Sequence, residues 1–112
     1  MAPQPYLSRT DRRVAKVKPI GDFQFLFLRS VLKLGKNAFG SAIQERIEKI
    51  LNVRVNPGQI YTTADKLIAD GYLESRPNSI QDNGRTATLY VCLPDGARAA
   101  EEKARLYKKM LD

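Results

Sequence analysis

Four polar side chains recur along one predicted helix at the spacing of a single helical face. They are Gln59, Thr62, Thr63 and Lys66, within residues 56–70, and none of the four is acidic. A glutamine amide can bond an adenine edge in a bidentate way, a threonine can contact the thymine methyl, and a lysine can pair with phosphate or guanine. This face therefore predicts contact with nucleotide edges, although solvated helix faces of similar composition are common.

The start of the same helix offers a second kind of contact. Asn56 is predicted to be its N-cap, and Pro57 follows at the first helical position, where the missing N–H costs nothing. Free N–H groups around Gly58 and the positive end of the helix dipole suit a phosphate. The Tyr61 ring could lie near a DNA backbone or pack over the preceding helix, and the residues leave both roles open. Gly71 is predicted to end the helix.

A hairpin is expected directly after this helix. Residues 72–76 and 86–93 have the composition of two strands, and the polar segment 77–85 is predicted to be the turn between them. Arg85, at the end of that turn, is a candidate for phosphate or minor-groove contact. Arg76 flanks the same hairpin and is a second candidate.

Two further helices are predicted before the polar one. Residues 22–34 form the first, with Asp22 as its N-cap, and it is apolar on several faces. A helix on a single core needs only one apolar face, so a second copy of the chain is the simplest additional covering surface.

The second helix is predicted to begin at Ser41, with Gln44 three residues later as in a capping box. Ser41, at this helix start, is also counted among the DNA-contacting candidates. The polar helix described first comes third in the chain, and its predicted inward stripe is Ile60, Ala64, Leu67 and Ile68.

A final helix is predicted from Gly96 to the end of the chain, because residues 94–96 should break the preceding strand. Its small and apolar residues recur at spacings of three and four, at Ala97, Ala100, Ala104, Tyr107 and Leu111. This seam favours contact with a helix of a second chain, although it also suits packing on the chain's own core. The predicted dimer interface is Phe23, Phe27, Ala100, Ala104, Tyr107 and Leu111.

Composition limits the classes of function. The chain has 112 residues, enough for one domain, and 19 Lys and Arg against 12 Asp and Glu give a net charge of +7. This excess favours a polyanionic partner. Residues 1–19 are predicted to be a flexible tail, which either lies along DNA or only aids solubility. Its basic residues are Arg9, Arg12, Arg13, Lys16 and Lys18.

Other features argue against catalysis and membranes. Histidine is absent, and Cys92 is the only cysteine, so the commonest general base is missing and no intrachain disulfide can form. No apolar run is long enough to span a bilayer, and the first residues do not form a secretory signal. We therefore expect a cytoplasmic, nucleoid-associated protein that is not an enzyme, with no cofactor and no bound metal. The sequence leaves room for a small-molecule effector but does not indicate one.

Four motifs in order resemble the PadR-like family of winged helix-turn-helix transcriptional regulators. Residues 39–43 are similar to the family's aromatic-Gly-x-x-Ile opening, and residues 56–61 to its Ser-x-Gly-x-x-Tyr segment. Residues 67–75 are similar to Leu-x-x-x-Gly-Leu-Leu/Val-x-Ser, and residues 84–96 to Gly-Arg followed by Tyr-x-Leu-Thr-x-x-Gly. Pro94 replaces the usual threonine. Tryptophan is absent, which argues against the aromatic drug-stacking pocket of some relatives.

The resemblance, to the small subclass of the family, implies a repressor that is a homodimer held by its first and last helices, with the third helix in the DNA major groove. We therefore expect a mostly helical α+β fold. Residues 20–93 would form the winged helix-turn-helix domain, with a two-stranded wing, and residues 94–112 a dimerisation helix. The expected function is sequence-specific binding of double-stranded DNA. The alternatives are a winged-helix adaptor for other proteins, or a virus or plasmid protein for DNA partition or packaging.

Overall fold

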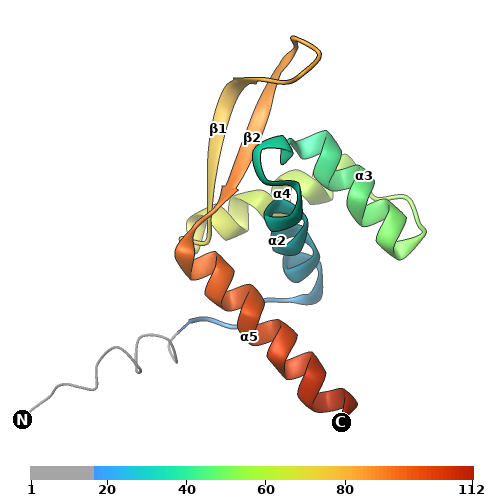
Figure 1. Cartoon of the computed structure of the whole chain (residues 1–112), viewed down its shortest axis with the longest axis vertical. Coiled ribbons are helices and arrows are strands. Elements are labelled where there is room, and N and C mark those ends of the chain that lie inside the picture. Colours follow the sequence, from blue (N-terminus) through green and yellow to red (C-terminus); the bar gives the residue numbers. More distant parts are fainter. Residues whose placement is uncertain (1–16) are drawn as a thin grey trace, which may run out of the picture.

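The computed structural model describes residues 17–112, and its elements follow the predicted order (Figure 1). They are α2 (Asp22–Leu34), the 3-10 turn η1 (Gly35–Asn37), α3 (Gly40–Leu51), α4 (Pro57–Ala69), β1 (Leu73–Ile80), β2 (Thr86–Cys92) and α5 (Pro94–Leu111). The two strands pair in an antiparallel sheet, and the hairpin that they form, the wing, projects beyond the helices. The predicted fold class, mostly helical α+β with a two-stranded wing, is confirmed.

Helix α2 is the centre of the core. It contacts α3, α4, α5 and β2, so most of its circumference is covered by the chain's own elements. Phe27 and Leu28 are fully buried in this core, and the Phe27 ring meets the Tyr90 ring edge-on at 5.6 Å. The several apolar faces of α2 therefore do not require a second chain. Phe27, predicted at the dimer interface, is an internal residue of the protomer.

The first turn of α2 differs from the prediction. Gly21, not Asp22, is the N-cap, and the Gln24 side chain accepts a hydrogen bond from the Gly21 N–H at 2.8 Å. Asp22 is the first helical residue. Its carboxylate accepts a hydrogen bond from the Tyr107 hydroxyl and lies 3.2 Å from the Lys103 ammonium, so it connects α2 to α5.

The predicted capping box of α3 is wrong. Phe39 is the N-cap, Ser41 lies inside the first turn, and Gln44 donates a hydrogen bond to the Val55 carbonyl instead of reaching back. The reason is a contact that is distant in sequence. Phe39 is held in extended conformation by a bridge to Leu89 of β2, and the helix begins directly after it.

The wing is longer than predicted. Strand β1 continues through Pro77, so the turn contains only residues 81–85. A register shift between Arg76 and Ser79 accommodates the proline, and Asn78 within it has a positive φ of 61°. One extra residue on β1 forms a β-bulge, the kind of irregularity at which a strand tolerates proline.

Helix α5 begins earlier than predicted, because Pro94 occupies its first turn instead of only ending the strand. Gly96 is buried where α5 crosses the start of the wing. A Cβ atom on it would lie 2.2 Å from the Tyr72 carbonyl oxygen, so the position requires glycine. Ala100 is 1% exposed and belongs to the core, whereas Ala104 and Leu111 are exposed.

The described residues at the end of the predicted tail are attached to the core. Val17 packs against the core, Ile20 is buried, and the Tyr72 hydroxyl donates a hydrogen bond to the Lys18 carbonyl at 2.9 Å. The basic residues 9–16 lie outside the described residues. Within residues 17–112, no helix combines the length and apolarity that crossing a bilayer requires. The same residues contain no group of three or more acidic, histidine or cysteine side chains placed to hold a metal ion.

Candidate nucleic-acid interface

The turn between α3 and α4 is fixed by side chains of α3. Gln44 donates a hydrogen bond to the Val55 carbonyl at 2.9 Å, and the Val55 N–H donates one to a Glu48 carboxylate oxygen at 2.8 Å. The Val55 side chain is itself buried. Asn52, in the left-handed conformation with φ 57°, ends α3 and redirects the chain. These contacts set the angle at which α4 leaves α3.

The predicted start of α4 is confirmed. Asn56 is the N-cap, its side-chain oxygen accepts a hydrogen bond from the Gly58 N–H at 2.7 Å, and Pro57 follows at the start of the helix. Both Asn56 and Gly58 are exposed. The helix start therefore presents backbone N–H groups and the positive end of the dipole to solvent, an arrangement that can bind an anion.

The polar face of α4 stands clear of the fold. Gln59, Thr62 and Lys66 are exposed and Thr63 is half-buried, whereas Ile60, Ala64 and Leu67 pack into the core on the opposite side. Ile68, predicted in the inward stripe, is 36% exposed. It lies about 100° around the helix from Leu67, on the side away from the core centre.

Asp70 forms ion pairs with the lysine at the C-terminal end of this face and with Lys18. Its carboxylate lies 3.6 Å from the ammonium groups of both Lys66, one turn earlier, and Lys18. The Asp70 side chain is 16% exposed and the Lys66 side chain 55%. The carboxylate therefore partly neutralises two cations while leaving both ammonium groups accessible to a stronger anionic partner.

One acidic residue of α4 was missing from the predicted face. Asp65 is exposed, one turn beyond Tyr61 and Thr62, and its i+3 spacing from Thr62 could have identified it. A carboxylate there would repel phosphates but could accept a hydrogen bond from the cytosine amino group. The Tyr61 ring is 60% exposed. Burial raises the pKa of the Tyr90 hydroxyl, and the nearby charges of Tyr61 and Asp65 raise it further.

The two predicted arginines of the wing occupy different places. Arg85 is exposed at the tip, where its N–H donates a hydrogen bond to the Asn83 side chain at 3.0 Å and its carbonyl accepts one from the Gln81 N–H at 2.7 Å. Arg76 lies well below the tip, opposite Leu89, and its guanidinium is 2.8 Å from the Glu74 carboxylate. The tip therefore presents Arg85 without Arg76.

The remaining candidate, Ser41, is exposed in the first turn of α3. No side chain caps that helix start, so its first backbone N–H groups can donate hydrogen bonds to an outside partner. The structure thus gathers the predicted α4 residues on one helix, with Arg85 on the wing and Ser41 on the preceding helix as separate positions.

Solved structures share this fold at low sequence identity. The complex structure of hsRosR-S4 matches with a TM-score of 0.63 and 25% identity, covering 86% of this chain and 77% of that chain. F93 from STIV, a winged-helix DNA-binding protein, matches with a TM-score of 0.64 and 19% identity, covering 83% of this chain and 95% of that chain. A PadR-like transcription factor from Bacteroides fragilis matches with a TM-score of 0.61 and 18% identity, covering 91% of this chain and 89% of that chain. No protein-family model and no curated protein matches the sequence.

These likenesses agree with the element order and the hairpin in residues 17–112. They show that the chain is a winged-helix protein, with the fold of the PadR-like regulators that its sequence motifs resemble.

Proposed function

We propose that the protein is a transcriptional regulator that binds double-stranded DNA through α4 and the tip of the wing. The observation that carries this proposal is the exposed polar face of α4. Gln59 and Thr62 present an amide and a hydroxyl to solvent immediately after a capped helix start. A helix of this kind fits the major groove, where such groups can read base edges.

The wing supplies a second contact in this proposal. It extends beyond the helices (Figure 1). Arg85 is exposed at its tip. With α4 in the major groove, a hairpin of this length can reach the neighbouring backbone or minor groove, where an arginine is attracted by the phosphates. The overall charge of +7 favours the same partner. The names of the structural neighbours, which include a DNA-binding protein and a transcription factor, agree with this function.

We further infer a homodimer that acts as a repressor by covering promoter DNA. The second half of α5 supports the dimer, because it projects from the body of the protomer (Figure 1). It also carries exposed apolar side chains. Leu106, Met110 and Leu111 are 50%, 70% and 87% exposed. Together with half-buried Phe23 and exposed Ala104, they form the surface that a second copy would cover. Sedimentation should give twice the chain mass.

Lys66 gives the direct test of the binding face. Lys66→Ala removes one ammonium group that can reach phosphate, so it should weaken binding to all sequences alike. The slope of log affinity against log salt should fall by about one unit. A gel-shift titration at several salt concentrations measures both effects.

Lys109→Ala, on the exposed end of α5, is the matched control with the same change in net charge. Equal salt slopes for Lys66→Ala and the unmodified protein would remove Lys66 from the interface. Equal losses for Lys66→Ala and Lys109→Ala would mean that only net charge matters.

A further inference from the structure

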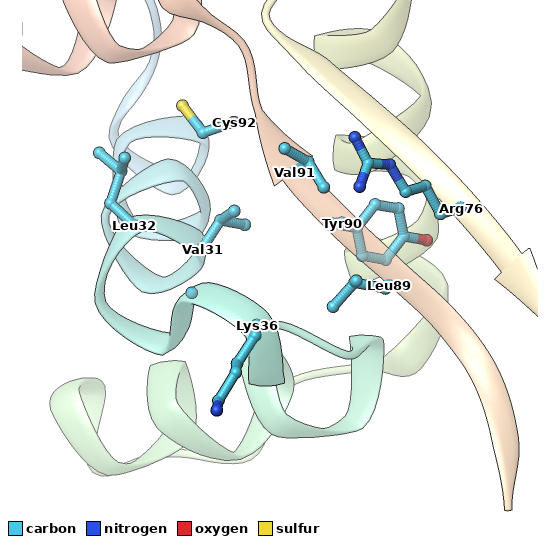
Figure 2. Close-up of a pocket in the computed structure, with 9 residues that line it drawn as sticks. Val31, Leu32, Lys36, Arg76, Leu89, Tyr90, Val91 and Cys92 are labelled. Carbon is cyan, nitrogen blue, oxygen red and sulfur yellow. The ribbon is translucent and has the colours of Figure 1, made fainter. Parts of the chain in front are cut away.

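A cavity of about 320 Å³ opens between α2 and β2 at the base of the wing (Figure 2). Its lining residues are Val31, Leu32, Gly35, Lys36, Arg76, Leu89, Tyr90, Val91 and Cys92. None of these belongs to the proposed DNA-binding surface, which consists of α4 and the tip of the wing. Sites for small molecules have volumes from about 300 Å³ upward and are mostly apolar, so the cavity has the size for a small ligand only.

The walls of this cavity come from two elements that the core fixes. Val31 on α2 is 2% exposed, and Leu89 on β2 is held by its bridge to Phe39. Figure 2 shows the side chains of Leu32 and Val31 on one side and those of Leu89, Val91 and Cys92 on the other. Because both walls are parts of packed elements, the cavity exists before any ligand arrives, and binding does not require a new fold.

The charged residues of the lining are all basic. Lys36 follows the end of α2 and Arg76 lies on β1, so the two cations come from different elements at the edge of the cavity (Figure 2). Among residues 17–112, none of the ion pairs involves Lys36, whereas Arg76 is paired with Glu74 at 2.8 Å. An apolar cavity with a free ammonium group at its edge is complementary to a molecule with an apolar body and one negative charge.

We propose that this cavity binds a small amphipathic carboxylate, with its apolar body between α2 and β2 and its carboxylate at Lys36. Arg76 can add a second contact by exchanging Glu74 for the ligand. A ligand in this place would touch both the central helix and the base of the wing. Ligand binding is measured on the protein without DNA, so its outcome does not depend on whether the protein recognises DNA.

Cys92 provides a built-in reporter for the test. It is the only cysteine of the chain and lines the cavity, so a thiol-alkylating probe modifies one known position. Burial raises the pKa of the Cys92 thiol, so the alkylation rate should be measured at mildly alkaline pH. Octanoate, used below its micelle-forming concentration, is the carboxylate probe. Octylammonium, with the same apolar body and the opposite charge, is its control.

The expected result is that octanoate slows alkylation of Cys92 in a saturable way and that octylammonium does not. Lys36→Gln should weaken the protection about tenfold, as expected for loss of one charge-assisted hydrogen bond. Lys33→Gln makes the same charge change at an exposed lysine of α2 that does not line the cavity, so protection should remain. The methyl NMR signals of Val31 and Leu89 should shift with octanoate, while those of Leu111 should not.

Three results would overturn the proposal. The first is an alkylation rate that octanoate leaves unchanged, together with unshifted methyl signals of Val31 and Leu89. The second is equal protection by octylammonium, which would show that the charge is not recognised. The third is equal loss of protection in Lys36→Gln and Lys33→Gln, which would place the carboxylate elsewhere.

Discussion

The N-cap of α4 allows helix stability and DNA affinity to be changed separately. Asn56→Ala removes the acceptor of the Gly58 N–H, whose hydrogen bond is 2.7 Å long and exposed to solvent. Because water can replace that acceptor, the loss should be about 1 kcal/mol, typical of an N-cap, and not the larger penalty of a buried orphan donor. For a domain of this size, about 1 kcal/mol lowers the melting temperature by roughly 4–8 °C.

Asn56→Asp should preserve or raise the stability of the protein but lower its affinity for DNA. The carboxylate still accepts the Gly58 hydrogen bond and interacts favourably with the helix dipole, which contributes about 0.3–1 kcal/mol. The melting temperature should therefore be unchanged or slightly higher. DNA affinity should fall, because the added negative charge would lie where a phosphate is proposed to approach Asn56 and Gly58.

Thermal denaturation followed by circular dichroism and gel-shift titration measure the two effects. Lys109→Gln, on the exposed end of α5, lowers the net charge by the same amount and serves as the control. A melting temperature of Asn56→Ala equal to that of the unmodified protein would refute the role of the cap. Undiminished DNA affinity of Asn56→Asp relative to Lys109→Gln would refute the phosphate site at the start of α4.

Two further predictions concern stability. Gly96→Ala should lower the free energy of unfolding measured by urea denaturation, because its Cβ would lie 2.2 Å from the Tyr72 carbonyl oxygen. Overpacking costs about 1–3 kcal/mol, which exceeds the roughly 1 kcal/mol gain in helix propensity. The control Gly40→Ala, whose Cβ would make only ordinary contacts, should be tolerated, and equal stabilities of the two variants would contradict the close approach at Gly96. The hydrogen bond from the Tyr107 hydroxyl holds the pKa of Asp22 below its ordinary value, so the Asp22 contribution to stability is present above that value and lost as pH falls through the folded-state pKa. Asp22→Asn should therefore lower the melting temperature at neutral pH but not in strong acid, and a difference that does not depend on pH would disprove this link.

Features that depend on neighbouring residues were predictable from the sequence. The start of α4 was predicted correctly because it depends on adjacent residues: Asn56 caps the Gly58 N–H, and Pro57 occupies the first turn. The order of helices and strands and the presence of the wing were also correct, because each element has its own periodicity or turn residues.

The wrong predictions concern features that are determined by contacts between residues distant in the sequence. Ser41 has the chemistry of a cap, but the bridge from Phe39 to Leu89 starts α3 earlier. Phe27 was assigned to a dimer surface because the sequence does not show how many elements would surround α2. Pro77 is accommodated in a strand by a bulge that only the pairing with β2 defines. The separation of Arg76 from Arg85 follows from the same pairing.

The most direct test of the central claim is selection of bound sites from random DNA duplexes at near-physiological salt, with the unmodified protein and Gln59→Ala in parallel. We expect the unmodified protein to enrich a motif with two-fold symmetry, and Gln59→Ala to lose the preference at one base position of each half-site while retaining the others. Recovery of no enriched sequence, or of the same motif with undiminished preference from Gln59→Ala, would contradict recognition of bases by the exposed face of α4.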